Sequence, residues 1–369
     1  MKRIWTRVMC LICIVCGLGL YFYPLYSDYQ LDKETDKAEQ EVESYISNFN
    51  NASSDSSSTE ENTPETTKSD RQKSGHTVTK KKKTVITEED KKNDSLYKEI
   101  DAYNQSIYEN KQSDLKDAWS YMQSPVSLKS LKTNVYGIIR IPRMRVRLPI
   151  YLGASGKHLS HGAAVMGQTS IPIGTSNTNS VIAGHRGWNT GSFFRHIERM
   201  RVGDYVYITN PWQTLRYKVT SIDVVSPYDT EKIKIQEGKD MITLLTCHPY
   251  LSHGNKYRYL VYCERDTSYT GSTQYQNTSE TYVVSETEKT LKNKSIKDYV
   301  NEAIGKNDKA SNMIVTSNGS QYESSEVEIN QEDSLRNLGA IVSIFFIAIW
   351  VISLLSKLLK FVFQKLKGG

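Results

Sequence analysis

A series of short, β-rich runs between Val135 and Arg265 constrains the fold of this chain more than any other feature. The runs are rich in β-branched and aromatic residues, and turn-forming residues separate nearly all of them, as is typical of strands joined by turns. The pattern predicts an antiparallel barrel or a sandwich, with one short helix near residues 192–200. The eight runs cover residues 136–141, 146–151, 180–183, 205–208, 215–220, 222–225, 241–245 and 257–262.

Polar sequence flanks this region on both sides. Of the 369 residues, 24% are charged, and the segments 31–94 and 267–335 hold too few apolar residues to offset chain entropy by burial. We therefore expect one compact domain at 135–266 between two polar tethers, the first of them disordered. Apolar residues at helical spacing predict a helical segment within 95–134, just before the domain.

Within the first tether, the apolar spacing over 32–50 permits a short amphipathic helix, although no apolar segment follows for it to pack on. The run Lys80–Lys83 has two interpretations, a solvated part of the linker or a contact with anionic wall polymers or lipid headgroups. The net charge of +6 comes from such runs and from the tails, so it does not indicate nucleic-acid binding.

Two apolar segments near the chain ends predict membrane anchors. Residues 8–23 follow a basic start and precede aromatic residues, with no small-x-small cleavage pattern, which favours an uncleaved anchor over a signal peptide. Residues 338–355 carry no charge, are long enough to span a bilayer, and precede several lysines. We therefore expect two membrane helices, within 1–30 and 336–369, in the cell membrane, with the β-rich domain outside the cell.

Cys247 is the candidate nucleophile. It follows an apolar strand-like run and precedes Pro249, which lacks an amide donor and ends the strand, so Cys247 lies at an edge. A thiol attacks well only as a thiolate, which at neutral pH needs a positive group nearby. Cys263 is expected to be buried and structural, because hairpin geometry keeps it away from Cys247. The other cysteines, Cys10, Cys13 and Cys16, lie in the first apolar segment.

His185 and Arg258 are the candidate partners of this thiol. Among seven histidines, only His185 lies in a glycine-flanked turn directly after a buried strand. An antiparallel return from Cys247 brings Arg258 beside it, and Arg258 is favoured over Lys256 because a guanidinium offers a rigid fork of donors. Such a set would support acyl transfer, with thiolate attack, an acidic imidazole and an arginine at the oxyanion. Each residue alone also fits a plain structural role.

Three separated segments, together with others, resemble the sortases, specifically the class C branch that polymerises pilins. These segments are Ser180–Gly187 (SVIAGHRG), Gly238–Tyr250 (GKDMITLLTCHPY) and the final strand with Arg258, and residues 148–153, 203–204 and 221–229 fit the same pattern. The resemblance covers roughly 137–265 and, more loosely, the preceding helix and both anchors. The motif set is specific, because the segments agree in residue type, order and strand context.

The resemblance implies a closed eight-stranded β-barrel on a Gram-positive cell surface, with Cys247, His185 and Arg258 as the catalytic residues. Cys247 would cleave an LPxTG-like sorting signal between Thr and Gly and hold a thioacyl intermediate. The amine of a pilin lysine, or of lipid II, would then resolve it. Thr246 would lie near the substrate carbonyl. No cofactor is implied, and no clustered carboxylate loop indicates a metal.

Two places depart from the class C pattern. Where that class carries an Asp-Pro-aromatic lid, this chain has Asp117-Ala118-Trp119, which predicts either a lid with Asp117 near Cys247 and Trp119 in the groove, or a helix whose Trp119 packs on the barrel. The turn at 251–255 is about two residues longer than expected, which affects the register of Arg258.

Other function classes fit the chain less well. In papain-like proteases the cysteine precedes the histidine, whereas His185 comes first here. A non-catalytic pilus-assembly scaffold would tolerate loss of Cys247, and a housekeeping sortase that anchors surface proteins to peptidoglycan differs only in the acceptor amine. The C-terminal apolar segment and the lid-like stretch favour polymerisation.

Overall fold

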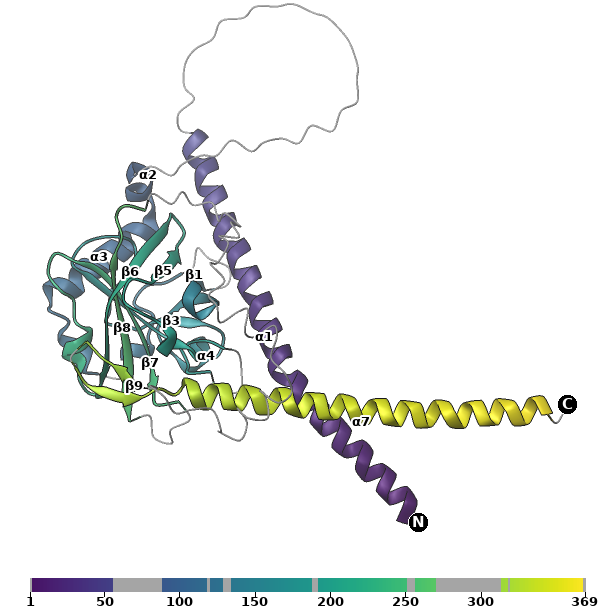
Figure 1. Cartoon of the computed structure of the whole chain (residues 1–369). Coiled ribbons are helices and arrows are strands. Elements are labelled where there is room, and N and C mark those ends of the chain that lie inside the picture. Colours follow the sequence, from purple (N-terminus) through teal and green to yellow (C-terminus); the bar gives the residue numbers. More distant parts are fainter. Residues whose placement is uncertain are drawn as a thin grey trace, which may run out of the picture.

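The computed structural model describes residues 2–55, 88–117, 120–128, 134–187, 192–250, 256–269, 313–317 and 319–367. Eight strands close into a barrel in the order β1-β2-β3-β4-β7-β8-β6-β5, which confirms the mainly β fold and the closed eight-stranded barrel (Figure 1). They are β1 Val135–Ile141, β2 Val146–Leu152, β3 Ala163–Val165, β4 Thr178–Ala183, β5 Tyr205–Thr209, β6 Thr214–Val225, β7 Asp240–His248 and β8 Tyr257–Arg265.

The strand set differs in two places from the predicted one. The runs at 215–220 and 222–225 form a single strand, β6, whose pairing with β8 shifts register between Val219 and Ser221. The missing eighth strand is β3, which is only three residues long and therefore shows no alternation in the sequence. The barrel is also not fully antiparallel, because β2 pairs with β3, and β4 with β7, in parallel.

The parallel pair β4 and β7 decides where the functional residues meet. Both strands run in the same direction, so their carboxyl ends lie at the same rim of the barrel. Alternate residues of these strands fill the barrel interior, among them Ile182 and Leu244, while Val181 and Ala183 belong to a second apolar cluster on the outer face. At the rim, side chains of one parity therefore face the barrel core, and side chains of the other parity face the second apolar cluster.

The N-terminal part is more ordered than predicted. Residues 31–55, expected in a disordered tether, instead continue helix α1, Lys2–Asp55, which contacts β1 and β2. Ala38 is buried against Val135 and Ile138, and Arg147 forms a 2.6 Å ion pair with Glu39. The apolar surface on which this part of α1 packs is thus the wall of the barrel, which is distant in the sequence. The remainder of that tether, including the lysine run, lies outside the described residues up to Glu88.

Short helices complete the domain. Helix α3 begins after Asp94, whose carboxylate accepts a hydrogen bond from Tyr97 N, and buries Leu96 and Ile100, as the helical spacing predicts. The others are α2 Glu88–Asn93, α4 Gly156–Leu159 and the 3₁₀ helices η1 Ser113–Lys116, η2 Ser120–Met122, η3 Pro142–Met144, η4 Ile197–Arg199 and η5 Thr230–Ile233, with α3 spanning Ser95–Glu109.

The last part of the predicted second tether also returns to the barrel. Strands β9 Met313–Val315 and β10 Gln321–Glu323 form a two-stranded sheet, and α7, Glu326–Lys367, follows and contacts α1 (Figure 1). Among the described residues, one helical stretch, Glu326–Ser353, is long and apolar enough to cross a membrane. This stretch is compatible with the C-terminal anchor, whereas the N-terminal anchor stays a prediction.

Candidate active site

Cys247 and Arg258 lie directly opposite each other across the β7–β8 ladder, with Leu245 opposite Leu260 on the same face. Opposed residues of an antiparallel pair carry Cβ atoms about 4.5–5.5 Å apart. Both side chains are half-buried, and the thiol forms no disulfide. The turn at 251–255 is outside the described residues, but the flanking register places Arg258, and not Lys256, opposite the cysteine.

His185 reaches the same rim through the parallel strand. Ala183 pairs with Leu245, and the ladder continues one residue further, because Gly184 N donates to Leu245 O at 3.0 Å. His185 follows immediately, two residues beyond Ala183 and therefore at its parity, that of the outer face. The three predicted catalytic residues thus come from three strand ends at one place on the barrel rim.

Local packing fixes the turn that carries His185. Phe194 N donates to His185 O at 2.9 Å, and the ring of Phe193 meets the imidazole edge-on with 6.2 Å between ring centres. A side chain at Gly184 would bring Cβ within 2.8 Å of the Phe194 ring, so only glycine fits there. His185 is exposed at the surface, but packing against its neighbours desolvates the imidazole in part and lowers its pKa below the ordinary value. The imidazole is therefore mainly neutral at neutral pH.

Thr246 does not contact the outer face. Its side chain is buried, and its hydroxyl donates to Gly184 O at 2.7 Å. Alternation in β7 turns the Thr246 side chain away from the face of Cys247, and the expected contact with a substrate carbonyl stays a prediction. In this position the hydroxyl ties the end of β7 to the turn that carries His185.

The lid-like segment crosses the outer face as two 3₁₀ turns and not as a continuous helix. Leu115 is fully buried in the outer cluster with Leu260 and Tyr262, and the Tyr121 hydroxyl donates to Leu115 O. Ala154 N donates to Tyr121 O at 2.7 Å, which fixes the second turn. Asp117 is exposed between the two turns, and Trp119 lies outside the described residues.

Cys263 is buried in the barrel core, as predicted, and burial raises the pKa of its thiol. One group that sequence reasoning missed is Glu198, a buried carboxylate in contact with Arg186 and His248. The only signal for it was the charged Arg186 beside His185, which needs a partner once buried. In the described part of the chain, no cluster of three or more His, Cys, Asp or Glu residues is arranged to hold a metal ion.

Comparison with known proteins gives consistent matches. A model of the sortase domain matches residues 139–266. Sortase A of Streptococcus agalactiae is 34% identical over 122 residues, which are 32% of this chain and 49% of that protein. Sortase A of Bacillus anthracis is 29% identical over 162 residues, 43% of this chain and 75% of that protein. The chain thus spans about half the length of the first of these relatives and three quarters of the second.

Solved structures give matches of the same kind. Sortase C of Clostridium perfringens has 32% sequence identity and a TM-score of 0.39, and the match covers 49% of this chain and 92% of that chain. Sortase C2 of the Group B Streptococcus pilus island 1 has 34% identity and a TM-score of 0.40, with 46% and 96% covered.

Proposed function

Because the chain belongs to the sortase family of cysteine transpeptidases, we propose that it cleaves an LPxTG-like sorting signal between Thr and Gly and transfers the acyl part to an amine. The observation that carries this proposal is the pairing register of strands β7 and β8 at the barrel rim. It puts Cys247 opposite Arg258 and joins the His185 turn to the same strand end.

The chemistry follows from these three residues. The Cys247 thiolate attacks the Thr carbonyl carbon, and the Arg258 guanidinium stabilises the oxyanion that forms. Protonated His185 gives its proton to the departing Gly amine as the C–N bond breaks, which leaves a thioester on Cys247. An incoming amine then loses a proton to neutral His185, forms the new amide bond and releases the thiolate. The lowered pKa of His185 makes its protonated form a stronger acid for the first step.

The acceptor that we propose is a lysine amine of a pilin, so that repeated transfer polymerises pilus subunits. Support comes from the lid-like turns around Leu115 and Tyr121 over the outer face, and from the apolar stretch Glu326–Ser353. Transfer to the amine of lipid II would use the same thioester and is the alternative outcome of the test. We further propose that α1 and α7 both anchor the chain, with the barrel outside the cell.

The acceptor test uses the full chain in detergent with a sorting-signal peptide and three separate acceptors: a lysine-bearing pilin domain, a lipid II analogue and water. Mass spectrometry of the products shows which amine is joined to the Thr carbonyl. We expect the isopeptide product to dominate. A wall-type product in its place would assign the chain to anchoring, and products that persist in Cys247→Ala would contradict the proposed enzyme.

A further inference from the structure

A buried ionic cluster lies behind the catalytic rim and is built from the residues that directly follow the two catalytic ones. Arg186 follows His185, and its Nη2 lies 2.6 Å from Glu198 Oε1. His248 follows Cys247, and its Nδ1 lies 3.3 Å from the same oxygen. All three cluster residues are at least nine-tenths buried. One carboxylate oxygen therefore joins the chain segments that present the imidazole and the thiol.

The other carboxylate oxygen is satisfied by the C-terminal segment. Glu198 Oε2 accepts hydrogen bonds from the Ser324 hydroxyl at 2.9 Å and from Ser325 N at 2.7 Å. Burial alone would raise the pKa of Glu198, but the contacts with His248 and Arg186 outweigh it and lower the pKa to about 2. The carboxylate is thus ionised. Its second oxygen accepts its hydrogen bonds from donors more than a hundred residues downstream.

Two more contacts connect the same segment to the end of β7. The ring of Tyr322 meets the His248 imidazole edge-on, with ring centres 4.7 Å apart. The Ser325 hydroxyl accepts a hydrogen bond from Tyr250 N at 3.2 Å, three residues after Cys247. Strand β10 and the residues after it therefore contact the turn that follows the nucleophile directly.

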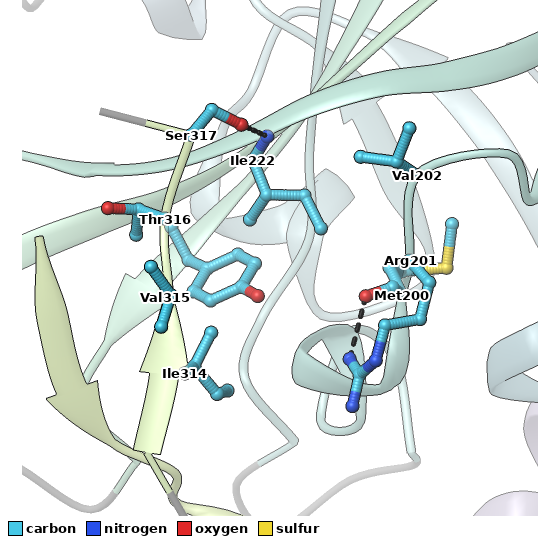
Figure 2. A pocket seen from close by; sticks show the side chains of 9 residues that line it. Met200, Arg201, Val202, Ile222, Ile314, Val315, Thr316 and Ser317 are labelled. Carbon is cyan, nitrogen blue, oxygen red and sulfur yellow. Dashed lines mark hydrogen bonds between the residues drawn. The ribbon is translucent and has the colours of Figure 1, made fainter. Parts of the chain in front are cut away.

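Nearer to β9, the segment contacts β6 and borders a cavity. Ser317 is tied to Ile222 through its hydroxyl at 2.9 Å and its amide at 2.8 Å, as Figure 2 shows for the first contact. Between β9 and the barrel lies a cavity of about 280 Å³ lined by residues such as Met200 and Tyr259 (Figure 2). The polar contacts around Glu198 are therefore part of what joins this segment to the barrel.

We propose that Glu198 is a positioning residue for transpeptidation, and that Tyr322, Ser324 and Ser325 complete its support, so that docking of residues 319–325 sets the relative placement of His185 and Cys247. The inference rests on the proposed function. A buried charge costs desolvation energy, and removing one partner leaves the others unpaired, so the cluster is sensitive to single changes. A displacement of about 1 Å at the rim is enough to lower a rate about a hundredfold.

The test uses the full chain in detergent and the variants Glu198→Gln and Ser324→Ala. Steady-state cleavage of a sorting peptide gives kcat and KM, and alkylation of Cys247 by iodoacetamide against pH, read by mass spectrometry, needs no substrate. We expect Glu198→Gln to lower kcat by about 10- to 100-fold with KM within about threefold. The alkylation profile should shift as well. Ser324→Ala, which removes one donor, should lower kcat by about three- to tenfold.

Glu326→Gln is the matched control. Glu326 binds Arg199 at 2.9 Å and His196 at 3.1 Å, so it holds the same segment with the same charge, yet neither of its partners follows a catalytic residue. We expect a loss of kcat of less than about threefold and a wild-type alkylation profile in this variant. An equal loss of kcat in Glu326→Gln would overturn the specific role of Glu198 and assign the effect to docking in general.

A folded Glu198→Gln protein with unchanged kcat and unchanged alkylation would also overturn the inference, with thermal unfolding used to verify folding. If Glu198→Gln does not fold, Ser324→Ala carries the test, and wild-type values there would contradict the proposal. If the wild-type chain cleaves no sorting peptide, the proposed function fails, while the alkylation profiles still decide whether Glu198 positions the thiol.

Discussion

At Arg258, the effect of the positive charge can be separated from the effect of the guanidinium geometry. Its guanidinium lies opposite Cys247 and also donates to Tyr257 O at 3.0 Å, so the side chain is oriented on its own strand. A guanidinium presents several donors in a fixed plane, whereas an ammonium is a mobile point charge. The oxyanion requires donors held in place before it forms.

We therefore predict that Arg258→Lys lowers kcat/KM by about 10²- to 10³-fold although it keeps the positive charge. Peptide cleavage followed by liquid chromatography measures the loss. Lys256→Ala is the control, since Lys256 has the same parity two residues earlier but is not opposite the cysteine, and it should stay within about twofold of wild type. Loss of activity in Lys256→Ala with an active Arg258→Lys would reverse the assignment.

The lowered pKa of His185 predicts the pH range in which its imidazole titrates in the folded chain. Burial disfavours the charged imidazole, so protonation of His185 in the folded chain occurs below its ordinary pKa of about 6.5. In the Cys247→Ala protein, the titration midpoint of His185 measured by NMR should therefore lie below about 6.5. Because the pKa of His185 is lower in the folded chain than in the unfolded chain, the unfolded chain binds this proton at a higher pH. The contribution of His185 to the free energy of unfolding therefore falls as the pH drops through these two pKa values.

Phe193→Leu tests the cause of this shift, because it removes the ring that meets the imidazole edge-on while keeping an apolar side chain. The titration midpoint of His185 should move upward, toward 6.5, in this variant. The measurement is an NMR titration in the Cys247→Ala background, so that the thiol does not contribute to the curve. An unchanged or lower midpoint would show that Phe193 does not contribute to burial of the ring.

Among the elements, α1 is the clearest case of order that comes from distant contacts. The sequence pattern over 32–50 allowed a helix, but the surface that buries Ala38 lies on β1, about a hundred residues later. Strands β9 and β10 escaped prediction for a related reason, because three-residue strands carry no periodicity. By contrast, the register that places Arg258 opposite Cys247 was predictable, since strand parity is local in the sequence, while the catalytic roles of Cys247, His185 and Arg258 stay predictions.

Docking of α1 should contribute to stability without taking part in catalysis. Ala38→Glu places a carboxylate against Val135 and Ile138, and an unpaired buried charge is costly. We expect the thermal midpoint to fall by several degrees, at about 2–4 °C for each kcal/mol lost. The kcat should stay within about twofold. Lys37→Gln, at the exposed neighbouring position, is the control and should leave the midpoint unchanged. An unchanged midpoint in Ala38→Glu would show that α1 does not dock.

For the whole molecule, α1 and α7 contact each other where they cross, and beyond the crossing they diverge as they extend away from the barrel (Figure 1). The proposed topology places the barrel outside the cell and both chain ends inside. In a Cys247→Ala background, we predict that Tyr228→Cys, at an exposed position on the barrel, is labelled by an impermeant maleimide on intact cells. Gly369→Cys should be labelled only after permeabilisation. Labelling of Gly369→Cys on intact cells would contradict the second membrane crossing.

The most direct test of the account is the intact mass of the full chain after a brief reaction with a sorting-signal peptide, followed by an acid quench. The account predicts a mass increase equal to the peptide fragment that ends in Thr, attached at Cys247, and its disappearance when an amine is added. The adduct should be absent in Cys247→Ser. An adduct on another residue, or turnover of the peptide with no dependence on Cys247, would contradict it.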